Sequence, residues 1–299
     1  MITLGAPAKV NLTLEVLGKR SDGYHEVRTL MQAIDLCDLL TFEPADGITL
    51  KCAEPELSSP DNLVMRAARL LAERSGRCAG ASITLEKHIP VAAGLGGGSS
   101  DAAATLMGLN LLWSLAFSKR DLFALAGQLG SDVPFFLYQG TALAEGRGER
   151  TTPLPDLSDY WLVIAVPPII DTDRKTARLY HSLLAEWFTD GRRTAQATQC
   201  IKDGLRLEPQ DLFNVFEKAA PSVFRGLEEY WRQVEELSRC KFHLAGSGPA
   251  LFAWFTEEAT ATEAHIRLRP EGLTTYLTRT VPACRTRPGS WPQTGSTRT

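Results

Sequence analysis

The strongest constraint on this chain is a cluster of four glycines at residues 94–98, within the sequence PVAAGLGGGSSDAA at residues 90–103. Glycine adopts positive φ without steric cost, so such a cluster folds readily into a concave nest of exposed backbone N–H groups. The residues that follow, 99–115, are rich in Ala and Leu and predict a long helix. A nest at the N-terminus of a helix attracts phosphate, because it combines free N–H groups with the positive end of the helix dipole.

Two familiar phosphate loops do not fit this cluster. A Walker loop needs a lysine directly after its last glycine, where this chain has Ser99. A dinucleotide fingerprint needs GxGxxG within a βαβ unit, and Ser99 stands in the place of the third glycine. A flexible linker or a tight turn is the non-functional alternative, but a linker would not lead straight into a long helix. The cluster therefore predicts a third kind of phosphate loop, in which Ser99 and Ser100 offer hydroxyls to phosphate or to a metal ion.

Composition and charge exclude several classes of protein. The 299 residues carry 32 Lys and Arg against 35 Asp and Glu, and a net charge of −3 does not suit a nucleic-acid binder. The six cysteines (37, 52, 78, 200, 240 and 284) lack metal or disulfide spacing, so we expect buried free thiols in a reducing cytosol. The most apolar run, residues 161–170, is too short to span a bilayer, and the N-terminal residues lack a secretory signal. We expect a soluble, cytoplasmic monomer or weak homodimer that acts on a small molecule, with no nucleic-acid or membrane partner.

The hydrophobic pattern favours an α+β fold, because strands come first, helices follow, and regular βαβ alternation is lacking. Residues 9–16 alternate polar and apolar, which predicts a half-buried strand with Lys9 and Asn11 on its polar face. Gly, Pro and charged residues crowd together at 146–159 and predict a boundary between domains at 1–150 and 151–284, before a disordered tail at 285–299. Further strands are expected at 24–34, 39–42, 48–52, 83–85, 135–138, 141–144, 161–166, near 242, at 251–255 and at 274–280, and helices at 62–74, 99–115, 118–129, 257–268 and within 173–239.

Four motifs carry a resemblance to a known family: PAKVNL at 7–12 with DGYH at 22–25, the glycine-rich segment at 90–103, GSDVP at 130–134, and LAGSGPALFAWF at 244–255. Across residues 3–280 the chain resembles the GHMP-type small-molecule kinases. Within them it is similar to the branch that phosphorylates 4-diphosphocytidyl-2-C-methyl-D-erythritol in the non-mevalonate isoprenoid pathway. The resemblance implies a two-domain α+β fold with the active site in the cleft between the domains. It also implies transfer of the γ-phosphoryl group of ATP, with Mg²⁺, to the 2-hydroxyl of that substrate.

The same resemblance implies roles at the reacting atoms and around ATP. Asp132 is the candidate base for the attacking hydroxyl, and Lys9 would favour its charged form and offset the charge that develops on the transferred phosphate. Val133 precedes a proline and is expected to be extended, which would place Asp132 at the end of an element. Taken singly, a solvated strand lysine and a helix-terminal aspartate are the simpler explanations. ATP binding is implied for Asn62 and Lys87, which would flank the adenine; a helix-start Asn and a surface Lys are the alternatives for these two. It is also implied for the glycine-rich segment, that is, for Pro90, Val91, Ala92, Ala93, Gly94, Leu95, Gly96, Gly97, Gly98, Ser99 and Ser100.

Substrate binding is implied for five residues, which are Asn11, Tyr24, His25, Thr176 and Tyr180. Tyr24 and His25 match positions that hold the cytosine by stacking and hydrogen bonding, and Asn11 would contact the polar part of the substrate. A hairpin aromatic and a surface histidine are the alternatives for the first two. The segment TARLY at 176–180 resembles a substrate segment with Tyr180 as a second stacking residue, although the stretch at 169–175 before it is longer than usual.

Two further segments bear on the site. The turn Gly246-Ser247-Gly248 is expected to fold beside the phosphate loop and support it. Val215 stands where the family has an acidic residue, so any role of a carboxylate there is lost. The protein ligands of Mg²⁺ are therefore open, with Ser100 as a candidate beside ATP and water.

Two other classes of function stay open from the sequence. One is a GHMP kinase for another alcohol, such as mevalonate or homoserine, against which the Tyr24-His25 segment argues. The other is a nucleotide-binding protein without catalysis, or a dinucleotide oxidoreductase. A coupled assay of ADP release with a panel of alcohols would separate the three.

Overall fold

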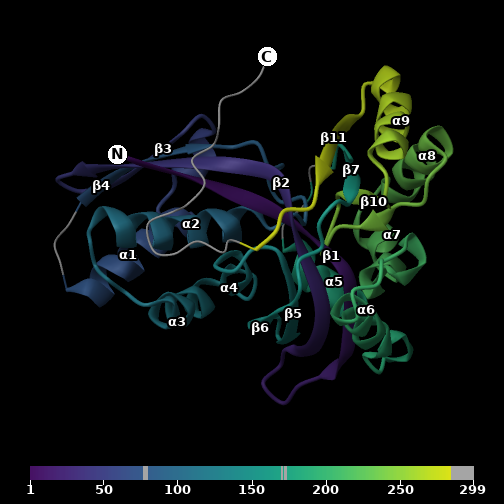
Figure 1. Cartoon of the computed structure of the whole chain (residues 1–299), viewed down its shortest axis with the longest axis horizontal. Helices are drawn as coiled ribbons and strands as arrows, with labels where there is room; N and C mark the ends of the chain where they lie inside the picture. The colour runs from purple at the N-terminus through teal and green to yellow at the C-terminus, as the bar shows by residue number, and fades with distance from the viewer. Residues whose placement is uncertain (77–79, 170, 172–173, 284–299) are drawn as a thin grey trace.

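The computed structural model of this chain describes residues 1–76, 80–169, 171 and 174–283 (Figure 1). Within these ranges the strands form a seven-stranded sheet with the order β3-β4-β2-β1-β8, to which β5 and β6 attach beside β2, and a four-stranded sheet with the order β11-β7-β10-β9. The first sheet contains β1 (Ile2–Lys19), β2 (His25–Ala45), β3 (Ile48–Cys52), β4 (Gly80–Glu86), β5 (Thr141–Gly146), β6 (Arg150–Pro153) and β8 (Phe213–Asn214). The second contains β7 (Trp161–Val166), β9 (His243–Leu244), β10 (Leu251–Phe255) and β11 (Thr274–Arg279).

The helices divide between the two halves of the molecule (Figure 1). The first group is α1 (Leu63–Ser75), α2 (Gly97–Leu112), α3 (Lys119–Leu129) and α4 (Val133–Phe136). The second is α5 (Lys175–Ser182), α6 (Arg192–Lys202), α7 (Ala220–Val223), α8 (Leu227–Ser238) and α9 (Glu258–Leu268). Short 3₁₀ turns lie at Pro55–Ser58, Ala185–Trp187, Pro209–Asp211, Val215–Lys218 and Arg269–Glu271. The mixed architecture confirms the α+β prediction.

The long antiparallel pair of β1 and β2 joins the two halves. Its register shifts at three places along β1, and such bulges bend a hairpin and increase its twist. At one end Leu4 and Met31 pack with α1–α4, whereas at the other Leu14 and Val16 pack with α7 and α8. The strands expected separately at 24–34 and 39–42 are therefore one strand, β2, because a bulged strand can continue where the alternation of the sequence weakens.

The polar face of β1 is buried, which corrects the prediction of a half-buried strand. Lys9 and Asn11 lie on one face as predicted, but each is only 4% exposed, and Glu15 is fully buried. The second half of the chain covers this face: the Glu15 carboxylate accepts a hydrogen bond from the N–H of Thr194 in α6, at 2.7 Å. Alternation in the sequence reports which residues are polar, and it does not report what packs over them.

The start of α4 corrects a second prediction. The expected strand at 135–138 is the helix α4 with the turn after it, and Val133 is its first residue and not extended. Proline is tolerated in the first turn of a helix, where its missing N–H has no partner to lose, so Pro134 fits at the second position of α4. Asp132 is the N-cap residue of α4, so its predicted place at the end of an element is confirmed.

Other local signals are confirmed. Asn62 caps α1, which ends at Gly76 with a φ of 65°, and Ser118 and Asp121 form the predicted capping box of α3. The helix after the glycines begins at Gly97 and ends at Leu112, slightly earlier than expected.

Strand β8 pairs in parallel with β1, so a segment beyond residue 151 joins the first sheet, and the boundary at 150/151 stays a prediction. The tail at 285–299, Cys78 and Cys284 lie outside the described residues.

The four described cysteines, at 37, 52, 200 and 240, are free but half-buried, not fully buried as expected. Within the described ranges no helix is long and apolar enough to cross a membrane.

The contact of α2 with β2 generates a stability prediction. A Cβ at Gly108 would lie 2.3 Å from the buried ring of Phe42, so we expect Gly108→Ala to lower the free energy of unfolding by about 1–3 kcal/mol. Gly127→Ala on α3 meets open space and is expected to raise it by about 0.5–1 kcal/mol. Urea denaturation of both variants measures the difference. If both variants raised the free energy of unfolding equally, the Phe42 ring would be able to move aside without a loss of stability.

Candidate active site

The glycine-rich loop connects β4 to α2 and is held in place by a second glycine turn. Gly94 has a φ of 93°, and a Cβ there would lie 2.1 Å from the carbonyl oxygen of Ala245 and 2.7 Å from the amide nitrogen of Gly248. The N–H of Ala250 donates to the carbonyl of Ala93 at 3.0 Å. The predicted contact between the two glycine segments is confirmed, and it leaves no room for a side chain at position 94.

Lys9 lies beneath this loop and points to Asp132. The backbone N–H of Lys9 donates to the backbone carbonyl of Leu95 at 2.9 Å. A Cβ at Gly96 would lie 3.0 Å from Lys9 Cγ. The Lys9 Nζ is 3.4 Å from Asp132 Oδ2 and donates to Asn11 Oδ1 at 2.6 Å. Lys9 is buried, whereas 36% of the Asp132 side chain is exposed. The pair thus offers an open carboxylate backed by a buried cation.

A chain of hydrogen bonds through Asn11 orients the Lys9 side chain on the side away from the cavity. The Asn11 Nδ2 donates to Thr29 Oγ1 at 2.6 Å, and that hydroxyl donates to the carbonyl of Thr13 at 2.6 Å. Because each polar atom in this chain of hydrogen bonds is buried and partnered, the chain fixes the direction of the Lys9 ammonium.

Lys87 joins two buried carboxylates beside the loop. Its Nζ donates to Asp38 and, at 2.9 Å, to Asp101 Oδ2, and Asp38 Oδ1 also accepts the N–H groups of His88 and Ile89. Burial raises the pKa of the Asp101 carboxyl, although Lys87 opposes that change. Burial also opposes the charge of Lys87, but its two carboxylate partners hold its pKa above the ordinary value. The alternative of a surface lysine is therefore wrong.

A cavity of about 450 Å³ opens over the loop and brings the predicted nucleotide residues together. Asn62, although it caps α1, lines this cavity together with Lys87, residues 90–99, Lys9, Asp132, Lys175, Thr176 and Ser247. Ser100 lies behind it in the first turn of α2, where its buried hydroxyl lacks a hydrogen-bond partner among the described residues.

A second cavity, of about 680 Å³, meets the first at Asp132 and Thr176. Its other lining residues are Lys19, Gly23, Tyr24, His25, Ser131, Arg147, Ala177, Tyr180 and His181. Four of the predicted substrate residues, Tyr24, His25, Thr176 and Tyr180, therefore share one cavity with the candidate base. The fifth, Asn11, lies behind Lys9.

The aromatic groups of the second cavity are already partly paired. The rings of His25 and Tyr180 stack at 4.7 Å with an interplanar angle of 15°, so in this structure a base does not fit between them. Burial lowers the pKa of His25, which favours the neutral imidazole. Tyr24 is 56% exposed, and the guanidinium of Arg147 lies 4.8 Å from its ring centre.

Several contributors to the site were not predicted from the sequence, among them Lys19 and Arg147 in the second cavity and Asp38 and Lys175 beside the first. Asp38 lies on β2, far from any of the motifs, and no sequence pattern near it indicates a role in the site. Lys175 directly precedes the TARLY segment, so its position beside a predicted substrate segment was the signal that could have found it.

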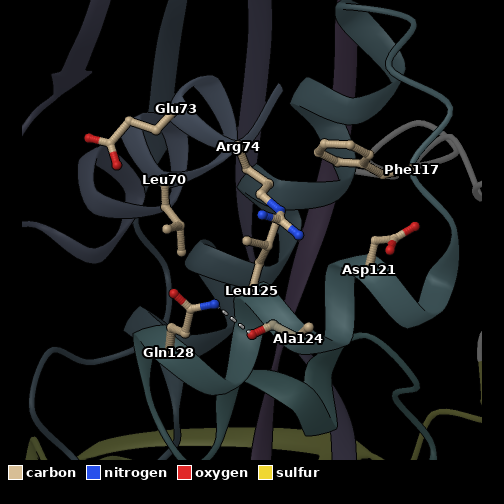
Figure 2. A pocket seen from close by; sticks show the side chains of 8 residues that line it. All are labelled: Leu70, Glu73, Arg74, Phe117, Asp121, Ala124, Leu125 and Gln128. Atoms are coloured by element: carbon tan, nitrogen blue, oxygen red, sulfur yellow. Dashed lines mark hydrogen bonds between the residues drawn. The ribbon is translucent and has the colours of Figure 1, made fainter. Parts of the chain in front are cut away.

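Another cavity, of about 520 Å³, lies between α1 and α3 (Figure 2). Its lining residues come from α1, α3 and the loop before α3, and they are Leu70, Glu73, Arg74, Phe117, Asp121, Ala124, Leu125 and Gln128. Asp121 is engaged by Ser118 in the capping box, and Gln128 donates to the carbonyl of Ala124 (Figure 2). The glycine-rich loop and Asp132 lie elsewhere, so the first two cavities are the candidate site.

The chain is similar to known kinases over most of its length. The profile described as "GHMP kinases N terminal domain" matches residues 62–140. The 4-diphosphocytidyl-2-C-methyl-D-erythritol kinase of Dehalococcoides mccartyi is 43% identical over 281 residues, 94% of this chain and 99% of that protein. The crystal structure of a 4-(cytidine 5'-diphospho)-2C-methyl-D-erythritol kinase has a TM-score of 0.78 and 34% identity, over 93% of this chain and 99% of the other. A homoserine kinase from Cytophaga hutchinsonii shares the fold, with a TM-score of 0.72 and 17% identity over 94% and 95% of the two chains.

The buried cluster around Lys87 generates a second prediction. Lys87→Met would leave the carboxylates of Asp38 and Asp101 without their cation, and breaking such a buried pair costs about 3–5 kcal/mol. Lys51→Met, at an exposed position of the edge strand β3, is the control and should change the free energy of unfolding by less than about 0.5 kcal/mol. Thermal or urea denaturation without nucleotide measures both. A Lys87→Met protein as stable as the control would contradict a structural role of the cluster.

Proposed function

Because this chain belongs to the family of 4-diphosphocytidyl-2-C-methyl-D-erythritol kinases, within the GHMP kinases, we propose that it transfers the γ-phosphoryl group of ATP to the 2-hydroxyl of 4-diphosphocytidyl-2-C-methyl-D-erythritol. This reaction is a step of the non-mevalonate isoprenoid pathway. The observation that carries the proposal is that two cavities of different chemistry meet at Asp132.

The cavity over the glycine-rich loop suits a triphosphate. Its floor offers backbone N–H groups and the N-terminus of α2, and both attract negative charge at short range. The second cavity suits the cytidine diphosphate part of the acceptor. Tyr24 and His25 can contact the base by stacking and hydrogen bonding, and Lys19 and Arg147 offer cations near its phosphates.

Phosphoryl transfer depends mainly on positioning and on stabilising charge. Asp132 accepts or orients the proton of the attacking hydroxyl where the two cavities meet. The Lys9 ammonium, 3.4 Å away, pairs with Asp132 and offsets the charge that builds on the transferred group. Asn11, through its bond to Lys9, acts as a positioning residue.

The family is ATP-dependent, and the residues present also fit Mg²⁺. Magnesium is usually held by substrate phosphates, water and one or two protein oxygens. Consistent with this, the described residues contain no group of three or more His, Cys, Asp or Glu that could hold a metal by themselves. The unpartnered hydroxyl of Ser100 would hold the ion beside the ATP phosphates. When bound, Mg²⁺ would neutralise part of the phosphate charge.

An assay of ADP release with a panel of alcohols tests the proposed activity. We expect turnover with 4-diphosphocytidyl-2-C-methyl-D-erythritol and none with mevalonate or homoserine. Turnover with mevalonate alone would overturn the proposed acceptor, and the absence of turnover with every alcohol would overturn the assignment of catalysis.

Asp132→Asn tests the candidate base. The amide keeps the size of the side chain but can neither accept the proton nor form an ion pair with Lys9, so we expect kcat to fall by about 10²–10⁴-fold. Because Asp132 lies where the two cavities meet and not in the glycine-rich loop, the affinity for ATP should change little. Single-turnover and steady-state measurements separate the two effects, and a nearly normal kcat would refute the assignment.

Tyr24→Ala tests the cytosine position. Loss of a stacking ring costs about 1–3 kcal/mol, which corresponds to a rise of about 5- to 150-fold in the KM of the cytidine substrate. Tyr24→Phe keeps the ring and is the matched control, with a KM near that of the wild type. If Tyr24→Ala leaves this KM unchanged, the ring serves only to pack against Arg147.

A further inference from the structure

Lys175 is the one cation of the nucleotide cavity that the family resemblance leaves without a role. It is the first residue of α5, and its Nζ donates to the carbonyl of Gly248 in the second glycine turn. The neighbouring Thr176 donates to the hydroxyl of Ser247 at 3.0 Å. These two contacts seat the start of α5 against the turn that supports the phosphate loop.

The charged groups that line this cavity are Lys9, Lys87, Asp101, Asp132 and Lys175. Lys87 is neutralised by Asp38 and Asp101, and Lys9 pairs with Asp132. Across the described parts of the chain no carboxylate pairs with Lys175, and its polar partner is a carbonyl. The cavity therefore contains one ammonium without a counter-ion from those residues.

Burial, and then the charge of Lys9, lowers the pKa of Lys175 to about 7. A buried ammonium beside another cation is unfavourable unless an anion is present. An anionic ligand in the cavity would remove both penalties, since it would neutralise the charge and replace lost solvation with hydrogen bonds.

We propose that Lys175 binds the γ-phosphate of ATP from the α5 side of the cavity. The inference rests on the proposed kinase function and adds a residue to it. The γ-phosphate is the part of ATP in question because the Gly246–Gly248 turn contacts both Lys175 and Lys9, and Lys9 pairs with Asp132. Thr176, next to Lys175, also borders both cavities. Lys175 therefore lies at the acceptor end of the nucleotide cavity.

The test compares the binding of an unhydrolysable ATP analogue with the binding of ADP, both with Mg²⁺ and without the acceptor. Lys175→Met keeps the length of the side chain and removes its charge. We expect the affinity for the ATP analogue to fall about 10- to 100-fold and that for ADP to change less than about threefold. Lys202→Met, at an exposed position on α6, is the matched control and should bind both nucleotides as the wild type does.

Proton exchange gives a second readout. Because a bound phosphate favours the charged ammonium, the wild-type protein should take up protons when it binds the ATP analogue at pH 7.5–8.5. Calorimetry in buffers of different ionisation enthalpy measures this uptake. We expect Lys175→Met to reduce it and Lys202→Met to retain it.

Three outcomes would overturn the proposal. If Lys175→Met binds the ATP analogue as tightly as the wild type does, Lys175 does not contact the γ-phosphate. An equal loss for the analogue and for ADP would assign Lys175 to holding the Gly248 turn, and Lys175→Arg would then restore both. If Lys175→Met takes up as many protons as the wild type, the uptake does not come from the Lys175 ammonium. A failure of the proposed function is distinguishable, because it appears as absent turnover of the wild type while these binding measurements still apply.

Discussion

The close approach of two backbone turns at Gly94 and Gly248 is the constraint on which the site depends. A single Cβ at position 94 would overlap the carbonyl of Ala245, so the turns can meet only where glycine is present. Their contact joins a loop of the first sheet to a turn between β9 and β10 of the second. Lys9 lies beneath one turn, and Lys175 is hydrogen-bonded to the other. The contact between the turns thus brings both lysines to one cavity, where Asn11 and Asp132 hold the Lys9 ammonium.

The charge of the protein is arranged around this contact. A net charge of −3 gives the molecule no general attraction for anionic ligands, so phosphate must be held locally. Three lysines, at 9, 87 and 175, line the cavity over the loop, and they differ in their partners. Lys87 serves the fold, because two buried carboxylates surround it, whereas Lys9 supports Asp132. All three lysines are at least partly buried, and their different partners give chemically identical side chains different surroundings.

Much of the local structure could be predicted from the sequence. The capping box at Ser118, the helix start at Asn62 and the helix after the glycines depend on neighbours within a few residues, and all three are confirmed. Val133 was predicted to be extended, but it begins α4 because proline is compatible with the first turn of a helix. The polar face of β1 was predicted to be partly solvated, but residues far along the chain cover it.

From the sequence alone we could identify the glycine-rich loop, its place before a helix, and the motifs shared with the GHMP kinases. These depend on backbone freedom and on residue order, which the sequence states directly. The folded structure was needed to show that Asp132 stands where two cavities meet, that His25 stacks on Tyr180, and that Lys175 bonds to the Gly248 turn. Those relations join residues that are distant in the chain, and they depend on burial and packing that no local pattern records.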